Sequence, residues 1–179
     1  MRKWLQTLAF LIYGLFAGCA QNPPAHLPEI KDPAFNKKLI ALLRFSTPLL
    51  GVDELNGGLS RKENWIILDA REREEYEVSH IPGARFAGYD HFKVEDWTGL
   101  PKDQPIVVYC SVGYRSEKIA GQLERQGFSN VFNLYGSIFE WVNRGYPVVD
   151  QKDQPTDTVH TYNKDWSRWV TNASIKKVW

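Results

Sequence analysis

The segment at residues 108–116, VYCSVGYRS, places a cysteine at the end of an apolar run and an arginine five positions later. The thiolate form of a cysteine such as Cys110 is a nucleophile. The guanidinium of Arg115 carries a planar fork of donors that suits an oxyanion. Cys110 therefore has two interpretations, either a small buried hydrophobe at a strand end or a nucleophile in an anion-binding loop.

The residues that follow Cys110 favour the second interpretation. Only six residues separate Tyr109 from a helix predicted to begin near Ser116, and Gly113 can adopt backbone angles that other residues resist. A loop this tight aims several N–H groups at one point, where the positive end of the next helix adds to their field. The same field favours the thiolate of Cys110. The candidate site comprises Cys110 and Arg115, with the loop residues Ser111, Val112, Gly113, Tyr114 and Ser116.

The N-terminal residues 1–18 have the pattern of an export signal. Arg2 and Lys3 precede an apolar run from Trp4 to Ala17, which is shorter than the roughly 20 residues that a membrane-spanning helix needs. We therefore expect a signal peptide here rather than a permanent membrane span.

The only other cysteine in the chain, Cys19, ends the sequence Phe-Ala-Gly-Cys at residues 16–19. This sequence is similar to the bacterial lipobox, which implies that Cys19 becomes the first mature residue and carries a lipid anchor. Ala20 matches the pattern for delivery to the outer rather than the inner membrane, so the protein is expected on the periplasmic side of the cell envelope. The alternative is an ordinary signal peptide with a coincidental cysteine. With Cys19 lipidated, Cys110 has no disulfide partner in the chain, and an unpaired thiol in an oxidising compartment is a liability unless it is buried or used.

The rest of the mature chain suits one domain with short additions. Removal of Arg2 and Lys3 with the signal changes the net charge from +1 to −1, so nothing indicates a nucleic-acid partner. Three scattered histidines show no ligand spacing, and we expect neither a metal site nor a cofactor; they are His26, His91 and His160. The predicted organisation is a Pro-rich lipidated tether at 19–31, a domain at 32–150 and an aromatic-rich extension at 151–179.

Within the domain, apolar runs that predict strands alternate with segments of helical periodicity. The pattern predicts strands at 65–68, 106–109 and 131–134, and helices at about 33–43, 116–126 and 137–144. A turn is expected at 56–58, the charged run 71–76 is interpreted as a solvated helix face, and a second turn is expected at 80–84. Alternation of this kind predicts an α/β fold, with a central parallel sheet and helices on both faces. Ligands of such sheets bind beyond the carboxyl ends of the strands, where Cys110 lies.

Residues 52–149 resemble the rhodanese-homology domain in its single-domain form. The resemblance rests on four motifs that occur in order. The first is Leu68–Arg71 with Glu75 and Tyr76 after it, and the second is 79–84. The third is the loop 110–116, and the fourth is Leu134–Gly136 leading to Trp141. It implies a rhodanese-like fold and a catalytic Cys110 that carries a persulfide. Ser79 and Ser137 stand where the family usually has glycine, and neither is expected to touch the chemistry. Val112 and Tyr114 replace residues that are often small, polar or basic, and we expect both at the mouth of the pocket.

The spacing within the loop favours sulfur transfer over phosphate chemistry. Cys110 and Arg115 are separated by four residues, whereas related phosphatases and arsenate reductases have five. The expected reaction takes sulfur from a small anion such as thiosulfate, with Arg115 and the loop amides holding the departing anion, and passes it to cyanide or a thiol. Asp69 and Arg71 look like a family pair that supports the loop, although a surface ion pair is the alternative. His80 is expected to make a structural hydrogen bond rather than to act as a base.

Other functions for the chain stay open at this point. The domain could be a catalytically idle module that binds a partner, or a persulfide carrier or thiol oxidoreductase whose acceptor is another protein. The extension, with Trp166 and Trp169 on one face of a short helix, either packs back onto the domain or forms a partner surface or a lid over Cys110.

Overall fold

The computed structural model describes residues 22–179. The expected signal peptide at 1–18 and the lipid on Cys19 lie outside these residues and stay predictions. Within residues 22–179, no helix is both long enough and apolar enough to cross a membrane.

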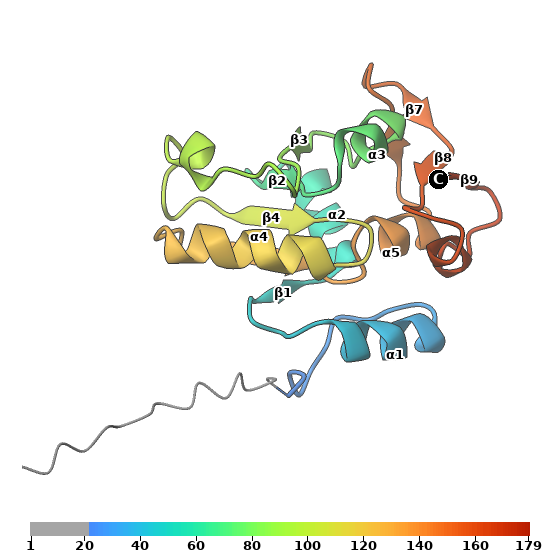
Figure 1. The fold of residues 1–179 in the computed structure, drawn as a ribbon, viewed down its shortest axis with the longest axis horizontal. Helices are drawn as coiled ribbons and strands as arrows, with labels where there is room; N and C mark the ends of the chain where they lie inside the picture. The colour runs from blue at the N-terminus through green and yellow to red at the C-terminus, as the bar shows by residue number, and fades with distance from the viewer. Residues whose placement is uncertain (1–21) are drawn as a thin grey trace, which may run out of the picture.

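A five-stranded sheet forms the centre of the molecule (Figure 1), and its strands run in the order β1-β5-β4-β2-β3. All four neighbouring pairs are parallel. The strands are β1 at Leu49–Leu50, β2 at Ile66–Asp69, β3 at Arg85–Phe86, β4 at Ile106–Tyr109 and β5 at Val131–Leu134. The three longer strands were predicted, and the two-residue strands were not. Because β4 is the middle strand, Cys110 lies at the centre of the carboxyl edge of the sheet.

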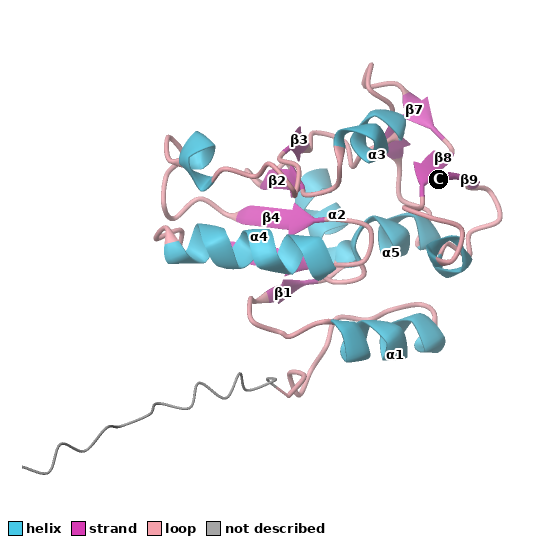
Figure 2. Cartoon of the chain, viewed as in Figure 1, coloured by secondary structure: helices cyan, strands magenta, loops and turns pink. Residues whose placement is uncertain are grey.

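Helices cover both faces of the sheet (Figure 2), which confirms the predicted architecture. Alternate residues of a strand point to opposite faces: Ile67 and Val107 pack in one core, and Ile66 and Val108 in the other. The first core contains residues of α1 (Pro33–Leu42), α2 (Val52–Ser60) and α5 (Ser137–Asn143), and the second contains residues of α4 (Tyr114–Arg125). The remaining helical segments are α3 (Arg73–Val78) and two short 3-10 helices, at Val94–Trp97 and Trp166–Trp169.

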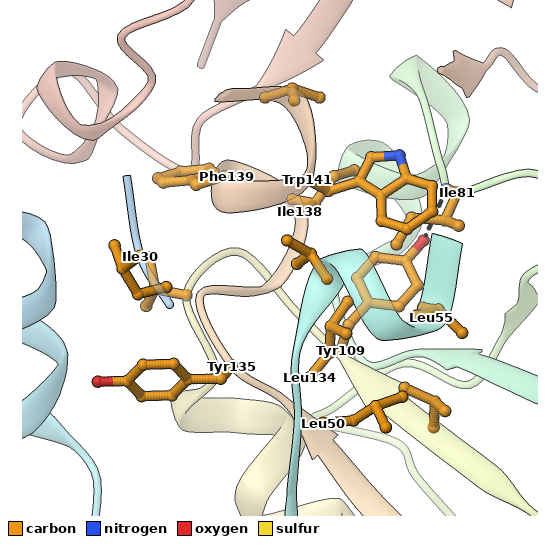
Figure 3. Close-up of a cluster of buried hydrophobic side chains, with 14 of the residues drawn as sticks. Ile30, Leu50, Leu55, Ile81, Tyr109, Leu134, Tyr135, Ile138, Phe139 and Trp141 are labelled. Atoms are coloured by element: carbon orange, nitrogen blue, oxygen red, sulfur yellow. Dashed lines mark hydrogen bonds between the residues drawn. The ribbon is translucent and has the colours of Figure 1, made fainter. Parts of the chain in front are cut away.

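The first core includes Tyr109, the residue that precedes Cys110. Figure 3 shows its ring among buried side chains and its hydroxyl near Ile81, whose backbone N–H donates to that hydroxyl at 3.1 Å. This bond fixes the turn at 80–84 to the end of β4.

One expectation from the sequence was wrong and another held only in part. The predicted turn at 56–58 lies inside α2, where Gly58 is needed for a close approach, because a Cβ there would lie 2.5 Å from Trp65 Nε1. The charged run at 71–76 is a solvated helix face only in part, at the exposed Arg73 and Glu74. Arg71 is fully buried before α3 begins and Glu75 is 3% exposed, since each has a partner of opposite charge in the interior.

The C-terminal extension packs against the domain, which was one of its two expected roles. It contains β7 (Pro155–Thr156), which pairs with β6 (Val148–Val149), and β8 (Thr158–His160), which pairs with β9 (Lys176–Val178). Val159 and Val170 are buried in the first core, and Trp169 stacks on Phe35 of α1 at 5.5 Å between ring centroids. In Figure 1 the extension lies at the end of the molecule towards which β4 points.

The N-terminal residues before α1 also contact the domain. Ile30, in the predicted tether, is 8% exposed in the first core, and the backbone N–H of Lys31 donates to Glu140 Oε1 at 2.8 Å. The helix itself begins as predicted, with Asp32 accepting a hydrogen bond from the backbone of Ala34.

Candidate active site

Cys110 lies in a short turn between β4 and α4, and is 1% exposed. Helix α4 begins at Tyr114, two residues earlier than expected, so the turn is tighter than the sequence indicated. Gly113 caps the helix at φ 109°, a left-handed backbone angle that favours glycine. Its N–H donates to Cys110 Sγ at 3.1 Å, and the Ser116 hydroxyl lies 3.6 Å from the same sulfur.

The surroundings of Cys110 stabilise the thiolate. Burial raises the pKa of the thiol, but the positive charge of Arg115 and hydrogen bonds from Ser116 and the Val112 backbone outweigh it, so the pKa lies below the ordinary value of a cysteine. The positive N-terminal end of α4 acts in the same direction. The turn therefore has the electrostatics of an anion cradle around a reactive sulfur.

Glu75 is part of the candidate site, although the sequence placed it only in a family motif and gave it no role there. Its carboxylate binds Arg115 through two hydrogen bonds, of 2.6 Å to Nη1 and 2.8 Å to Nη2, and accepts a third from Ser111 Oγ at 3.1 Å. Burial raises the pKa of Glu75, but the hydrogen bonds and the charge of Arg115 outweigh this effect. The pKa of the Glu75 carboxyl therefore lies below its ordinary value. Two donor groups of Arg115 are thus engaged by a carboxylate, and its main influence on Cys110 is through charge.

Asp69 and Arg71 form an ion pair whose side chains are fully buried, not a surface pair. Arg71 donates to Asp69 from Nε and Nη2, and its Nη2 also donates to the Ser79 carbonyl at 2.5 Å. Asp69 accepts a further bond from the Tyr109 hydroxyl at 2.6 Å. The pair therefore supports the loop indirectly, through the residue that precedes Cys110.

Ser137 contacts the backbone of Cys110 but not its sulfur, so the expectation that it does not touch the chemistry directly is not contradicted. Its hydroxyl accepts a bond from the Cys110 N–H at 3.2 Å and donates to the Leu134 carbonyl at 3.0 Å. Its φ of 53° is left-handed, which explains why the family uses glycine here. The only sequence signal was the departure from glycine itself. The other departure, Ser79, is fully buried and makes no comparable contact with Cys110 among residues 22–179.

Asn133 of β5 is a residue that the sequence did not mark. It is fully buried, donates to the Gly113 carbonyl at 3.0 Å, and accepts from Ser116 Oγ at 2.7 Å. It therefore fixes two residues of the loop whose donors contact Cys110 Sγ.

A pocket of about 400 Å³ opens above Cys110. Val112 and Tyr114 line it, as expected, together with Ser111 and Arg115. The C-terminal extension contributes Tyr162 and Trp166 to the wall, and the other lining residues are Leu42, Glu72, Tyr89 and Asp90. The extension thus both packs on the domain and borders the pocket.

His80 has the structural role that was expected. It is 2% exposed, its Nδ1 lies 3.1 Å from the Tyr76 carbonyl oxygen, and its ring stacks on Tyr76 at 4.0 Å between centroids. It does not line the pocket. In the described part of the chain, no three His, Cys, Asp or Glu side chains are grouped as a metal site would require.

Comparison with known proteins defines the class to which this fold and this cysteine loop belong. Residues 52–144 match the rhodanese-like domain family, so the chain belongs to that family. A protein named sulfurtransferase from Allochromatium vinosum is 31% identical over 97 residues, which cover 54% of this chain and 90% of that protein.

Other relatives are longer proteins. The tRNA uridine(34) hydroxylase of Staphylococcus epidermidis is 41% identical over 81 residues, which make up 42% of this chain and only 25% of the hydroxylase. Among solved structures, the rhodanese-like domain of an Anabaena protein superimposes with a TM-score of 0.54 at 26% identity, covering 57% of this chain and 79% of that one.

Proposed function

We propose that this protein is a sulfurtransferase that carries sulfane sulfur as a persulfide on Cys110. The observation that carries the proposal is the buried Cys110 sulfur, which accepts the Gly113 N–H at the start of α4 and has its pKa lowered by Arg115. Membership in the rhodanese-like family and the likeness to a protein named sulfurtransferase support the same reaction.

The proposed reaction has two halves. The Cys110 thiolate attacks the outer sulfur of a donor such as thiosulfate, the S–S bond of the donor breaks, and sulfite leaves with the electron pair. Cys110 then carries a terminal sulfur as Cys–S–S⁻, held by the donors of the loop. An acceptor such as cyanide attacks that outer sulfur, thiocyanate departs, and the Cys110 thiolate is regenerated.

The Cys110→Ser variant tests this proposal. After incubation with thiosulfate, the intact mass of the purified protein is expected to rise by one sulfur atom, whereas Cys110→Ser stays unchanged because a hydroxyl forms no persulfide. Cyanide is then expected to remove the added sulfur as thiocyanate.

The outcomes separate this function from its alternatives. No adduct on the unaltered protein with any sulfane-sulfur donor contradicts the proposal and favours an idle binding module. An adduct that forms on Cys110 but is released only to a protein thiol, with negligible thiocyanate, favours a persulfide carrier.

We further propose that the reaction takes place in the cell envelope, with the chain attached to a membrane through lipid on Cys19. The support is the sequence at residues 1–19, where a short basic start and an apolar run precede Ala-Gly-Cys.

Metabolic labelling with a fatty acid tests the anchor. The chain is expected to incorporate label and to sediment with membranes, whereas Cys19→Ser is expected to lose both properties because no acyl chain can be attached. Cys110→Ser is the matched control and is expected to keep both. Label that persists in Cys19→Ser, or an unlabelled parent chain, contradicts the anchor but leaves the sulfur chemistry untouched.

A further inference from the structure

The segment of the extension beside the Cys110 pocket is held in a defined position. Thr161 is fully buried and its N–H donates to the Val178 carbonyl at 2.8 Å. The next N–H, that of Tyr162, donates to His160 Nδ1 at 3.1 Å. Burial lowers the pKa of His160, which fits a neutral ring that accepts this bond. The segment is therefore a fixed wall of the pocket.

Further contacts attach the rest of the segment to α5. The Asn143 side chain donates to the Trp169 carbonyl at 2.8 Å and accepts from the Thr171 N–H at 2.7 Å. The Asn172 side chain donates to the Val142 carbonyl at 2.8 Å. Trp166, which lies between these contacts and Tyr162, is consequently also placed by the fold.

Two aromatic side chains of this segment face the pocket. Tyr162 is 55% exposed although its backbone is fixed, and its ring centroid lies 5.4 Å from the Arg115 guanidinium carbon. Trp166 is half-buried and lines the same space. Leu42 and Val112 continue the apolar surface down to Cys110. An exposed aromatic ring with a fixed backbone offers contact area to a ligand at little cost in entropy.

The charges around the pocket are of both signs and do not by themselves select a small dianion. Arg115 is the only cationic side chain among the lining residues, and its charge is balanced by Glu75 at 2.6 Å. Outside the lining, Lys118 Nζ donates to the Tyr114 hydroxyl at 2.8 Å. Glu72 and Asp90 add two carboxylates to the wall. Thiosulfate would meet these carboxylates and has no apolar surface to bury against the aromatic rings. A donor with an apolar organic body would gain free energy from burial there.

We propose that Tyr162 and Trp166 are specificity-determining residues that select an organic, low-molecular-weight sulfane-sulfur donor in preference to an inorganic one. The inference rests on the proposed sulfur transfer through Cys110. A pocket of about 400 Å³ is within the size range of small-molecule sites. The buried position of Cys110 beneath the extension also suits a small donor, which can enter whole.

The reaction with such a donor balances in the same way as with thiosulfate. With an organic thiosulfonate, R–SO₂–S⁻, the Cys110 thiolate attacks the terminal sulfur and the S–S bond breaks. The sulfinate R–SO₂⁻ leaves with the electron pair, and Cys110 becomes Cys–S–S⁻. The organic group R stays in the pocket beside Tyr162 and Trp166 until it departs with the sulfinate.

Three donors that differ only in what accompanies the sulfur test the inference: thiosulfate, methanethiosulfonate and benzenethiosulfonate. Each is used with cyanide as acceptor, and kcat/KM of a variant is divided by that of the parent protein for the same donor, which removes intrinsic donor reactivity. Trp166→Ala is expected to lower kcat/KM about 10-fold for benzenethiosulfonate and less than about 2-fold for thiosulfate, since only the former loses an aromatic contact. Methanethiosulfonate is expected to fall between them.

Matched variants separate selection from folding. Tyr162→Ala removes a mostly exposed ring and is expected to show the same donor-dependent loss without loss of fold, as monitored by circular dichroism. Trp179→Ala removes a different tryptophan of the extension, one that is exposed and does not line the pocket, and is expected to leave kcat/KM unchanged for every donor.

Equal losses for all three donors, or no loss in either variant, would overturn the inference while leaving the proposed function in place. Failure of every donor to load sulfur onto the parent protein would instead overturn the proposed function, and the inference with it.

Discussion

Replacing Arg115 with methionine is expected to lower kcat for sulfur transfer from thiosulfate about 100-fold, the usual scale for loss of one preorganised electrostatic group beside a reacting centre. Arg115 supplies the charge that most lowers the pKa of Cys110 against the opposing effect of burial. Methionine keeps a similar apolar stem but removes that charge. The measurement is steady-state thiocyanate formation by purified Arg115→Met and by the parent protein.

The pH dependence gives this prediction a second readout. In the parent protein, the rate of Cys110 alkylation is expected to rise with pH and to level off below the ordinary pKa of a cysteine, because the folded protein favours the thiolate. In Arg115→Met, burial is no longer opposed by the guanidinium, so the profile moves to higher pH. An unchanged profile would show that Arg115 does not control the thiol.

Loss of Arg115 also leaves Glu75 as a buried carboxylate without its cation. The pKa of Glu75 is lowered in the folded state, so the ion pair contributes stability that is present above the ordinary carboxyl pKa and is lost as pH falls through the lowered value. Arg115→Met is therefore less stable than the parent at neutral pH, and the difference shrinks in acid. Thermal melting across this pH range measures the effect.

Three controls separate the charge of Arg115 from its structural role. Arg115→Lys keeps the charge and is expected to restore much of the alkylation profile, but not the two-point contact with Glu75. Adding Glu75→Gln to Arg115→Met is expected to recover stability at neutral pH while sulfur transfer stays slow. Arg125→Met, at the exposed far end of α4, is expected to change neither property.

The elements of the fold that could be predicted are those whose signal is local. The apolar run at 106–109 and the periodicity of residues 116–123 each lie within one window of sequence, and so does the turn from Cys110 to Arg115. The two-residue strands β1 and β3 are too short to carry a pattern. The turn expected at 56–58 failed because glycine serves there for close packing against Trp65.

Arg115, Asp69 and Arg71 were predicted as residues of the site, but the long-range contacts of Arg115 and Asp69 could not be, because their partners are distant in sequence. Glu75 pairs with Arg115, 40 positions away, and Asp69 binds the Tyr109 hydroxyl at the same separation. Read locally, a run such as Arg71–Tyr76 is typical of a solvated surface. Only the parallel arrangement of β2 and β4 brings these groups together beneath one turn. The same holds for Tyr162, which reaches the pocket because the extension returns to it.

The largest effect on stability is expected from Asp69→Asn, which should lower the free energy of unfolding by about 3–5 kcal/mol, as measured by urea denaturation. Arg71 is fully buried, and among the described residues Asp69 is the only carboxylate within 4 Å of its guanidinium. Its Nη1 has no hydrogen-bond partner among those residues. Asparagine keeps the shape but removes the countercharge. The asparagine side chain also has an NH₂ group in place of one carboxylate oxygen. That donor would face the Arg71 guanidinium and the Tyr109 hydroxyl, which are themselves donors to Asp69.

An exposed ion pair of the same protein provides the control. Glu63→Gln removes the negative charge from the pair with Arg61, whose side chain is 64% exposed, and is expected to leave the unfolding midpoint unchanged because water screens that pair. An equal loss in both variants would contradict the assignment of the Asp69 effect to burial.

A double replacement distinguishes an uncompensated charge from a loss of packing. Asp69→Leu together with Arg71→Met removes both charges, and apolar replacements of a buried pair are often close to neutral. The double variant is therefore expected to recover much of the stability that Asp69→Asn loses. Recovery stays incomplete because the Tyr109 hydroxyl and the Ser79 carbonyl each lose a partner. Since Tyr109 precedes Cys110, sulfur transfer is expected to remain impaired even where the fold is restored, which would separate the pair's contribution to stability from its support of the nucleophile.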